Sequence, residues 1–435
     1  MNGAAPRRPF GLFSATALVV ANMLGAGVFT TSGFALADLG SRPRVMLAWA
    51  VGAVIALCGA ISYGGLVRRM TASGGEYLFL SRVVHPAAGF LAGWVSLLAG
   101  FTGAIAFAAT VFETYALPAE VRPEWLPSGV VGIAVIAVCA GLHGVVVRYG
   151  VRMQNAVVAI KMAFLAVFVV YAFARLGDAG WPGLDVVSSV PVFSLSAFAM
   201  SLVWISLSYS GFNAAVYIAG EIDDAPRTAP RALWLGTSIV AVVYLVLNAI
   251  FVYAPLPADV AGRPDVAIAA AAALGGPTLT AALRLIISLA LLSSVSSMIV
   301  IGPRVYARMA RDGVFPAFFA FPEGEEGRRA PQSSIVLQAL LAAMVVLVSG
   351  LAALLSYLGL LLSMSAAGTV ACLFVLRRRE GRAAVAGIGY PFVPAAFVIA
   401  TVGLGLLSAA QRPREWAAAA LTLASGWVAY RIFRR

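Results

Sequence analysis

The sequence predicts an all-α polytopic membrane protein with about twelve transmembrane helices. Of its 435 residues, 61% are hydrophobic and only 11% are charged, whereas about a quarter of the residues in soluble domains are charged. Apolar runs of roughly 20 residues, the length that crosses a bilayer as a helix, follow one another along the chain. The predicted spans lie near residues 12–37, 44–67, 86–117, 129–147, 153–175, 193–219, 232–254, 278–309, 333–350, 352–376, 390–410 and 414–432.

The distribution of arginine predicts how these spans are oriented. The net charge is +12, but most basic residues lie in connections on one side of the predicted bilayer, such as residues 377–382. The positive-inside rule therefore places both termini in the cytoplasm, for a protein of the plasma or inner membrane. The basicity is explained by topology, so no nucleic-acid partner is expected. The N-terminal apolar stretch lacks a convincing cleavage site before a soluble domain and is interpreted as the first span of a single domain, 1–435.

The placement of the cysteines and histidines, and the absence of common catalytic motifs, argue against several functions. Cys58, Cys139 and Cys372 fall within apolar runs, where small core residues are expected rather than a disulfide framework. His85 and His143 lie far apart without a carboxylate or cysteine cluster, so neither a metal nor a cofactor is expected. The sequence has no nucleophile elbow, phosphate-binding glycine loop or HExxH motif. An intramembrane enzyme would need a nucleophile–base pair that the sequence does not offer, so the protein is not expected to be an enzyme.

Two apolar runs are interrupted in mid-membrane by residues that favour unwinding. These are NMLGAGVF at residues 22–29 and SLSYSGFN at 206–213. Glycine has little helix propensity, and serine offers the backbone other hydrogen bonds. Close packing of small residues between helices is one explanation. Paired breaks five spans apart instead favour a transporter site between two repeats, near 12–175 and 193–376, with extra helices near 390–432.

Two broken helices of this kind suit an amino acid. The N–H groups of Gly25, Ala26 and Gly27 would begin a half-helix whose positive end attracts a carboxylate. Neither break contains an acidic residue, so nothing in them favours a cationic substrate. Carbonyl groups at the ends of the preceding half-helices would accept hydrogen bonds from an α-ammonium group, and the candidates are Ala21, Asn22, Leu207 and Ser208.

Lys161 is the single lysine of the chain and lies inside the apolar run AVVAIKMAFLAVFVVYAF. Burying a charged side chain at the bilayer centre costs roughly 2.5–3.5 kcal/mol on insertion scales, so such a residue usually faces the protein interior or water. The alternative is that its side chain reaches the headgroups from near a helix end. The position within the run makes this geometry strained, and we expect Lys161 to act as a functional or structural cation.

The interruptions and several further motifs resemble those of the amino acid–polyamine–organocation (APC) transporters. GAGVF at 25–29 is similar to the signature of the family's first helix, and SGFN at 210–213 to its sixth. YG at 63–64 with SGGEY at 73–77 resembles the end of the second helix and the following loop. RVYARMARDG at 304–313 resembles the inner end of the eighth helix. Within the family, Gly-Phe-Asn is similar to the Gly-Trp-Asn of the L-type neutral amino acid branch and its bacterial relatives.

This resemblance implies a LeuT-type 5+5 inverted repeat with broken helices 1 and 6. It also implies sodium-independent secondary transport of amino acids, mainly neutral ones, by alternating access, through exchange or proton coupling. Lys161 would replace a sodium ion and couple occupancy of the site to closure. The substrate contacts implied in the sixth helix are Ser210, Gly211 and Asn213, with Phe212 and Tyr244 as second-tier candidates.

Two departures from the family pattern concern specificity and partners. Leu207 stands where L-type members often carry a gating aromatic residue, so the gate differs. The external loop PAEVRPEWLPSG has no cysteine, and no disulfide-linked heavy chain is expected. Two other functions stay open: an amino acid sensor of the same fold that does not transport, and an amine or polyamine carrier. An amine carrier would favour acidic residues near the sixth helix, where the sequence shows none.

Overall fold

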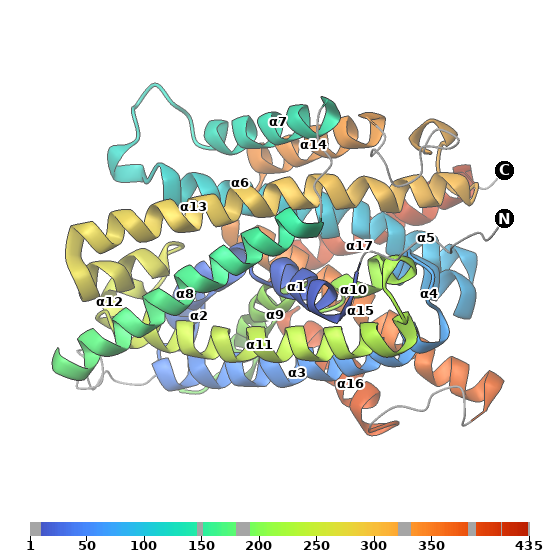
Figure 1. Cartoon of the computed structure of the whole chain (residues 1–435), viewed down its shortest axis with the longest axis horizontal. Coiled ribbons are helices and arrows are strands. Elements are labelled where there is room, and N and C mark those ends of the chain that lie inside the picture. Colours follow the sequence, from blue (N-terminus) through green and yellow to red (C-terminus); the bar gives the residue numbers. More distant parts are fainter. Residues whose placement is uncertain are drawn as a thin grey trace, which may run out of the picture.

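The computed structural model describes residues 10–145, 151–179, 192–320, 332–381, 389–409 and 411–433. In these ranges the chain is helical, and its only β-type pairing is an isolated bridge between Phe10 and Ile222. The longer helices run along one common direction, with α8 crossing the others obliquely (Figure 1). They are α1 (Leu12–Met23), α2 (Thr31–Leu39), α3 (Arg42–Arg69), α4 (Gly75–Val83), α5 (Pro86–Val95), α6 (Ala104–Ala116), α7 (Val130–Val145), α8 (Val151–Ala179), α9 (Leu195–Tyr209), α10 (Ala214–Tyr217), α11 (Ala225–Tyr253), α12 (Pro257–Val260), α13 (Val266–Arg311), α14 (Gln332–Val348), α15 (Leu351–Glu380), α16 (Phe392–Ser408) and α17 (Pro413–Phe433).

Many of these helices have the length and composition of membrane spans. Among the described residues, six helical segments are long and apolar enough to cross a membrane: 42–69, 86–116, 155–176, 225–253, 266–311 and 351–380. Five shorter apolar helices lie at 12–23, 130–143, 195–209, 332–348 and 392–408. The last predicted span forms α17, which belongs to neither group. The described chain is therefore a multi-pass, all-helical membrane protein.

The structure differs from the predicted spans in two places. The connection between the second and third spans folds into α4, a short helix that the apolar pattern does not show. The eighth predicted span, 278–309, is the inner part of α13, which begins at Val266 and bends at Gly276 with φ +62°. Pro277 follows this bend, and a helix is disfavoured at the residue before a proline. The alanine-rich residues before it continue as helix because they are good helix formers.

Both predicted interruptions are present. α1 ends at Met23, a 3-10 turn covers Ala26–Phe29, and α2 continues from Thr31. α9 ends at Tyr209, and the short helix α10 resumes at Ala214. Gly211, between these two helices, has φ +100°, a conformation that side chains other than glycine strongly disfavour. Each break thus coincides with the glycines that the sequence singles out.

A chain of buried hydrogen bonds holds α2, the second half of the first predicted span, against its neighbours. The indole N–H of Trp49 on α3 donates to the hydroxyl of Ser32 on α2 at 2.9 Å. That hydroxyl donates to the side-chain carbonyl of Asn248 on α11 at 2.6 Å. All three side chains are fully buried, so a missing partner would leave a buried polar group unsatisfied. The chain fixes α2 while the segment before it stays irregular.

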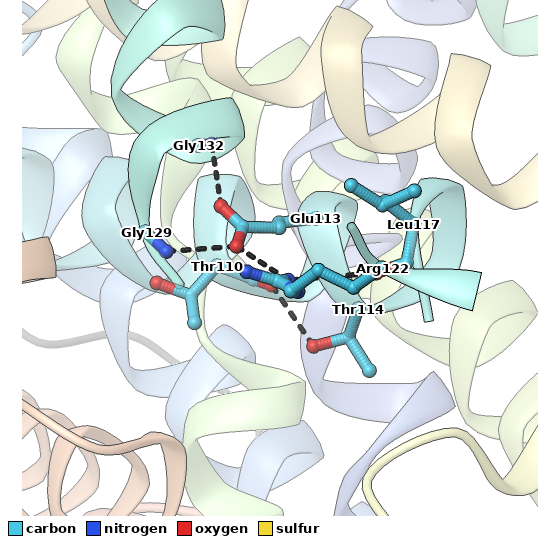
Figure 2. A network of polar contacts seen from close by, with 7 residues as sticks. All are labelled: Thr110, Glu113, Thr114, Leu117, Arg122, Gly129 and Gly132. Carbon is cyan, nitrogen blue, oxygen red and sulfur yellow. Dashed lines mark hydrogen bonds and ion pairs between the residues drawn. The ribbon is translucent and has the colours of Figure 1, made fainter. Parts of the chain in front are cut away.

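A second buried polar cluster, which we call the Glu113 cluster, lies where α6 meets α7 (Figure 2). The carboxylate of Glu113 accepts hydrogen bonds from the backbone N–H groups of Gly129 at 2.7 Å and Gly132 at 2.8 Å, at the start of α7. It also pairs with the guanidinium of Arg122 at 2.6 Å. Its negative charge lies at the positive end of the α7 dipole. The cluster joins α6, the loop that follows it and α7.

The beginning of the described chain is attached to the segment after α10. The N–H of Phe10 donates to the carbonyl of Glu221 at 3.4 Å, and the N–H of Asp223 donates to the carbonyl of Phe10 at 2.9 Å. The side chain of Phe10 is buried. These bonds connect the start of the first span directly to the end of the sixth.

Candidate functional site

A cavity of about 170 Å³ lies between the two interrupted spans. Its wall is completed by α3, by the π-helical stretch Ser96–Gly103 with α6, and by α13, α15 and α16. Of the residues predicted to bind substrate, Ala21 does not line it, and neither do Lys161 and Tyr244. Those that do are Asn22, Gly25, Ala26, Gly27, Leu207, Ser208, Ser210, Gly211, Phe212 and Asn213.

The two breaks touch each other through glycine. A methyl group added at Gly27 would lie 2.5 Å from Oγ and 2.8 Å from Cα of Ser208. One added at Gly211 would lie 2.8 Å from the carbonyl carbon and oxygen of Asn22. In contrast, a methyl group at Gly25 would meet only the carbonyl oxygen of Met23, at 3.9 Å. Gly27 and Gly211 therefore allow the backbones to approach, whereas Gly25 has open space beside it.

One backbone N–H group of the first break, that of Gly25, already has a hydrogen-bond acceptor within the break. Leu24, with φ −71° and ψ +66°, forms an inverse γ-turn in which Gly25 N–H donates to the carbonyl of Met23 at 2.7 Å. The first N–H groups of a helical segment have no partner within that segment. In the turn that follows, these are the groups of Ala26 and Gly27. Of the three N–H groups expected to bind a carboxylate, Gly25 is therefore already engaged.

The second break uses two of its carbonyl groups within the protein. The carbonyl of Leu207 accepts from the N–H of Ser210 at 3.0 Å. The carbonyl of Ser208 accepts from the hydroxyl of Tyr244, on α11, at 3.0 Å. The hydroxyl of Ser208 lies 2.9 Å from that of Thr31 on α2. The polar groups of this break thus fix its position against the first span.

Tyr244 joins the ends of both half-helices from behind the cavity. Its fully buried hydroxyl lies within hydrogen-bond distance of two carbonyl groups, those of Met23 and Ser208. Met23 ends α1, and Ser208 lies one residue before the end of α9. The hydroxyl proton of Tyr244 is shared between these two carbonyls, which have no N–H partner further along their own helices because the helices end there. Tyr244 therefore positions the site without contacting its interior.

Tyr244→Phe should lower the free energy of unfolding by about 1–3 kcal/mol, because the buried carbonyl of Ser208 loses its donor, whereas that of Met23 keeps the N–H of Gly25. Thermal denaturation in detergent measures the change. A matched control is Tyr357→Phe, whose hydroxyl lies 2.8 Å from that of Thr422 between α15 and α17. We expect Tyr357→Phe to lose less unfolding free energy, because the Thr422 hydroxyl keeps its hydrogen bond to the carbonyl of Ala418. Equal losses in the two variants would contradict this role of Tyr244.

Lys161 lies outside the cavity, on α8. Its ammonium nitrogen is 3.4 Å from Oγ of Ser294 on α13, and the side chain is partly buried. The expected bridge to the unwound part of the first span is not among the polar contacts that the structure describes. α8 does pack against both α1 and α13. Lys161 therefore lies on a helix that packs against both the first and the eighth spans, and its described partner belongs to the eighth.

Glu76 is a site residue that the sequence reasoning missed. It lies on α4, its side chain is buried, and it lines the cavity. Its Oε1 accepts from the hydroxyl of Tyr63 at 2.5 Å and the amide of Asn213 at 3.0 Å, and its Oε2 accepts from the hydroxyl of Ser365. The expectation of no acidic residue near the sixth span is therefore wrong. The signal was present in SGGEY at 73–77, an acidic residue directly after two glycines.

The remaining wall of the cavity is apolar and nearly free of charge. Its lining residues include one carboxylate, that of Glu76, and no lysine, arginine or histidine. Among the described residues, no group of three or more histidine, cysteine, aspartate and glutamate side chains could hold a metal ion. Apolar side chains cover the wall opposite the breaks, from Ile55 and Ala56 on α3, Phe107 on α6 and Phe397 on α16. The cavity thus combines exposed helix ends with an apolar surface.

An all-helical fold with many apolar helices and a cavity between two interrupted spans defines a multi-pass membrane protein of the transporter class. Residues 10–428 match the family described as amino acid permease. The chain belongs to this family, within the amino acid–polyamine–organocation group, and the resemblance found in its motifs is confirmed.

Several curated mammalian proteins are similar to the chain over much of its length. The large neutral amino acids transporter small subunit 2 of Mus musculus is 25% identical over 389 residues, which cover 87% of this chain and 72% of that relative. The Asc-type amino acid transporter 1 of Mus musculus is 23% identical over 381 residues, covering 86% and 71%. The b(0,+)-type amino acid transporter 1 of Mus musculus is 25% identical over 267 residues, covering 60% and 54%.

Proposed function

We propose that this protein is a secondary transporter of neutral amino acids that works by alternating access without sodium. The observation that carries the proposal is the cavity in which both breaks meet. The N–H groups of Ala26 and Gly27 begin a helical turn at its wall and suit a carboxylate. The apolar wall that includes Ile55 and Phe397 suits an uncharged side chain. The names of the similar proteins, which are amino acid transporters, support the same substrate class.

The proposal includes a topology of twelve spans, in which two inverted repeats of five are followed by two extra helices. Both termini are cytoplasmic, and the membrane is the plasma or inner membrane, as the positive-inside rule predicts. The contact between Phe10 and the segment after α10, at the end of the bundle that also carries α4, fits this arrangement.

With this orientation, we infer an inward-facing state from the residues on the two sides of the cavity. The cavity is lined on its cytoplasmic side by the inner half of the first span and by residues 213–218 after the second break. Packed aromatic rings close the opposite side, where Phe29 contacts Tyr115 with ring centroids 6.4 Å apart and Phe251 at 6.3 Å. The hydroxyl of Tyr115 also donates to the carbonyl of Phe29 at 2.8 Å.

Uptake of a labelled amino acid panel into proteoliposomes tests the proposed function. Vesicles are either empty or preloaded with the same amino acid, and the panel includes alanine, leucine and a diamine. Uptake only into preloaded vesicles identifies an exchanger, and uptake into empty vesicles that follows an imposed pH gradient identifies proton symport. Absence of any amino acid uptake, with protein that remains folded, contradicts the transporter proposal.

The same panel separates the two alternatives. An amino acid sensor would bind amino acids, as measured by calorimetry, but would show no counterflow. An amine carrier is favoured by one observation, the carboxylate of Glu76 at the cavity wall. Preferred uptake of the diamine over leucine would support the amine carrier.

We propose further that Lys161 couples substrate binding to closure as a fixed cation. Replacing it with methionine, which keeps the length of the chain but not the charge, is expected to reduce uptake strongly. Lys161→Arg keeps the charge and should retain a substantial part of the uptake. The rate of amino acid uptake into preloaded vesicles is measured for both variants. If the two variants lose the same fraction of activity, packing rather than charge explains the role of Lys161.

A further inference from the structure

Glu76 is a buried carboxylate whose partners come from three different parts of the bundle. Tyr63 belongs to α3, Asn213 to the segment between α9 and α10, and Ser365 to α15. Only 5% of Glu76 is exposed, yet it lines the cavity. Any motion that separates these three elements must therefore change the number of hydrogen bonds that the carboxylate accepts.

No basic group compensates the charge of Glu76 in the part of the chain that the structure describes. The titratable groups that face it are the hydroxyls of Tyr63 on α3 and of Tyr217 on α10. Its remaining donors, from Asn213 and Ser365, are neutral. A buried carboxylate without a cationic partner is stable only while hydrogen bonds replace its hydration.

Burial and hydrogen bonding act on the charge of Glu76 in opposite directions. Burial raises the pKa of its carboxyl above the usual range, and the hydrogen bonds from Ser365, Tyr63 and Asn213 oppose this rise. A hydrogen bond to a charged group is stronger than one between neutral groups. Loss of one or two of these bonds would therefore favour the neutral acid.

Asn213 is the partner whose position depends most directly on the second break. It follows Gly211, whose φ of +100° allows a sharp turn, and it precedes the four-residue helix α10. In alternating access, the irregular segments beside a site are the places where half-helices change direction. A reorientation of α10 relative to α4 would withdraw the Asn213 amide from Oε1 of Glu76.

We propose that Glu76 is a proton-binding site of the transport cycle. This inference rests on the proposed function and names a proton as the second ligand of the same cavity. In the arrangement seen here, three donors hold the carboxylate ionised. When Asn213 moves away, a hydronium ion in the cavity transfers its proton to an oxygen of Glu76, forming an O–H bond and leaving water.

The return of Asn213 reverses the transfer. The O–H bond of the Glu76 acid breaks, and the proton passes to a water molecule in the cavity, on the side to which the cavity is then open. Lys161 does not line this cavity and takes no part in this step. The coupling cation and the transported proton thus belong to two different residues.

Glu76→Gln tests the proposal because it keeps the shape and most of the hydrogen bonds. The glutamine carbonyl still accepts from Tyr63 and Asn213, and its amide donates to the hydroxyl of Ser365. Purified protein in proteoliposomes is assayed for counterflow into preloaded vesicles and for uptake into empty vesicles under an imposed pH gradient. The control is Glu380→Gln, at an exposed carboxylate that pairs with Arg69 at the end of α15.

We expect Glu76→Gln to reduce the uptake that follows the pH gradient much more strongly than it reduces counterflow, while Glu380→Gln keeps both. A pH-sensitive dye inside the vesicles should report proton entry with the amino acid in wild type and not in Glu76→Gln. Gradient-driven uptake that persists in Glu76→Gln would overturn the proton site, as would wild-type uptake that ignores the gradient. If wild type shows no counterflow at all, the proposed function itself fails.

A second measurement covers the case in which Glu76→Gln does not fold. Infrared difference spectra of the wild-type protein, with and without the amino acid, should show the band of a protonated carboxyl group that appears or disappears on binding. Asn213→Ala, which removes the donor, should shift this change toward the acid form. An unchanged carboxyl band in both proteins overturns the proposal.

Discussion

Gly211→Ala is expected to abolish amino acid uptake and to lower the free energy of unfolding by roughly 2–5 kcal/mol. Two independent effects add at this position. An alanine at φ +100° is strained, and its methyl group would lie 2.8 Å from the backbone carbonyl of Asn22. Because the neighbour is backbone rather than a flexible side chain, the two breaks must move apart. Thermal denaturation and uptake into preloaded vesicles measure the two consequences.

Two glycines provide matched controls for this result. Gly262, in the loop between α12 and α13, has φ +78°, and an added methyl group would meet nothing within 4 Å. Gly262→Ala therefore measures the backbone strain alone, about 1–3 kcal/mol. Gly25→Ala has neither a positive φ nor a close neighbour, so its stability should equal that of wild type. If Gly211→Ala loses no more stability than Gly262→Ala, the contact with Asn22 does not hold the breaks together.

Arg122→Ala is expected to lower the free energy of unfolding by about 2–3 kcal/mol. Removal of one partner of a buried pair costs roughly 3–5 kcal/mol, because the other charge is left uncompensated. The side chain of Glu113 is only 4% exposed, which favours a large effect. The N–H groups of Gly129 and Gly132 remain as donors, which reduces it (Figure 2). The loss appears as a lower midpoint of thermal denaturation.

A comparable pair with more solvent access serves as the control. Arg263 binds the carboxylate of Asp265 through two hydrogen bonds of 3.0 and 3.1 Å, and its side chain is 44% exposed. The side chain of Asp265 is only 10% exposed, but that of Arg263 is more open to solvent than that of Arg122, so Arg263→Ala should have a smaller effect than Arg122→Ala. A loss in Arg122→Ala no greater than in Arg263→Ala would show that the two backbone donors alone stabilise Glu113. The double variant Glu113→Gln with Arg122→Ala should recover part of the loss.

The helices and the two breaks could be predicted from the sequence because their causes are local. A run of apolar residues and a glycine pair act on the residues beside them, so α3, α11 and the turn at Ala26–Phe29 lie where the pattern predicts. The close contact of Gly27 with Ser208 is less local, but two breaks at corresponding places in two repeats already indicate that they meet.

Other features of the site depend on contacts between distant parts of the chain. Glu76 binds Asn213, which lies 137 positions further on, and no periodicity in either segment predicts this pairing. The γ-turn that engages Gly25 N–H depends on the backbone angles of Leu24, which the residue type does not specify. The sequence marks Lys161 as the single lysine of the chain, within an apolar run. Its described neighbour, Ser294, could not be chosen among the five serines of α13 without knowing how α8 packs.

The pairing of Phe10 with residues 221–223 has a mechanical consequence. Phe10 lies two residues before α1, and Glu221 ends the 3-10 turn that follows α10. The helices α1 and α10 are therefore joined at their far ends, while the end of α1 meets the second break where Asn22 contacts Gly211. We expect two helices that are joined at both ends to move together when the site opens and closes, rather than one after the other.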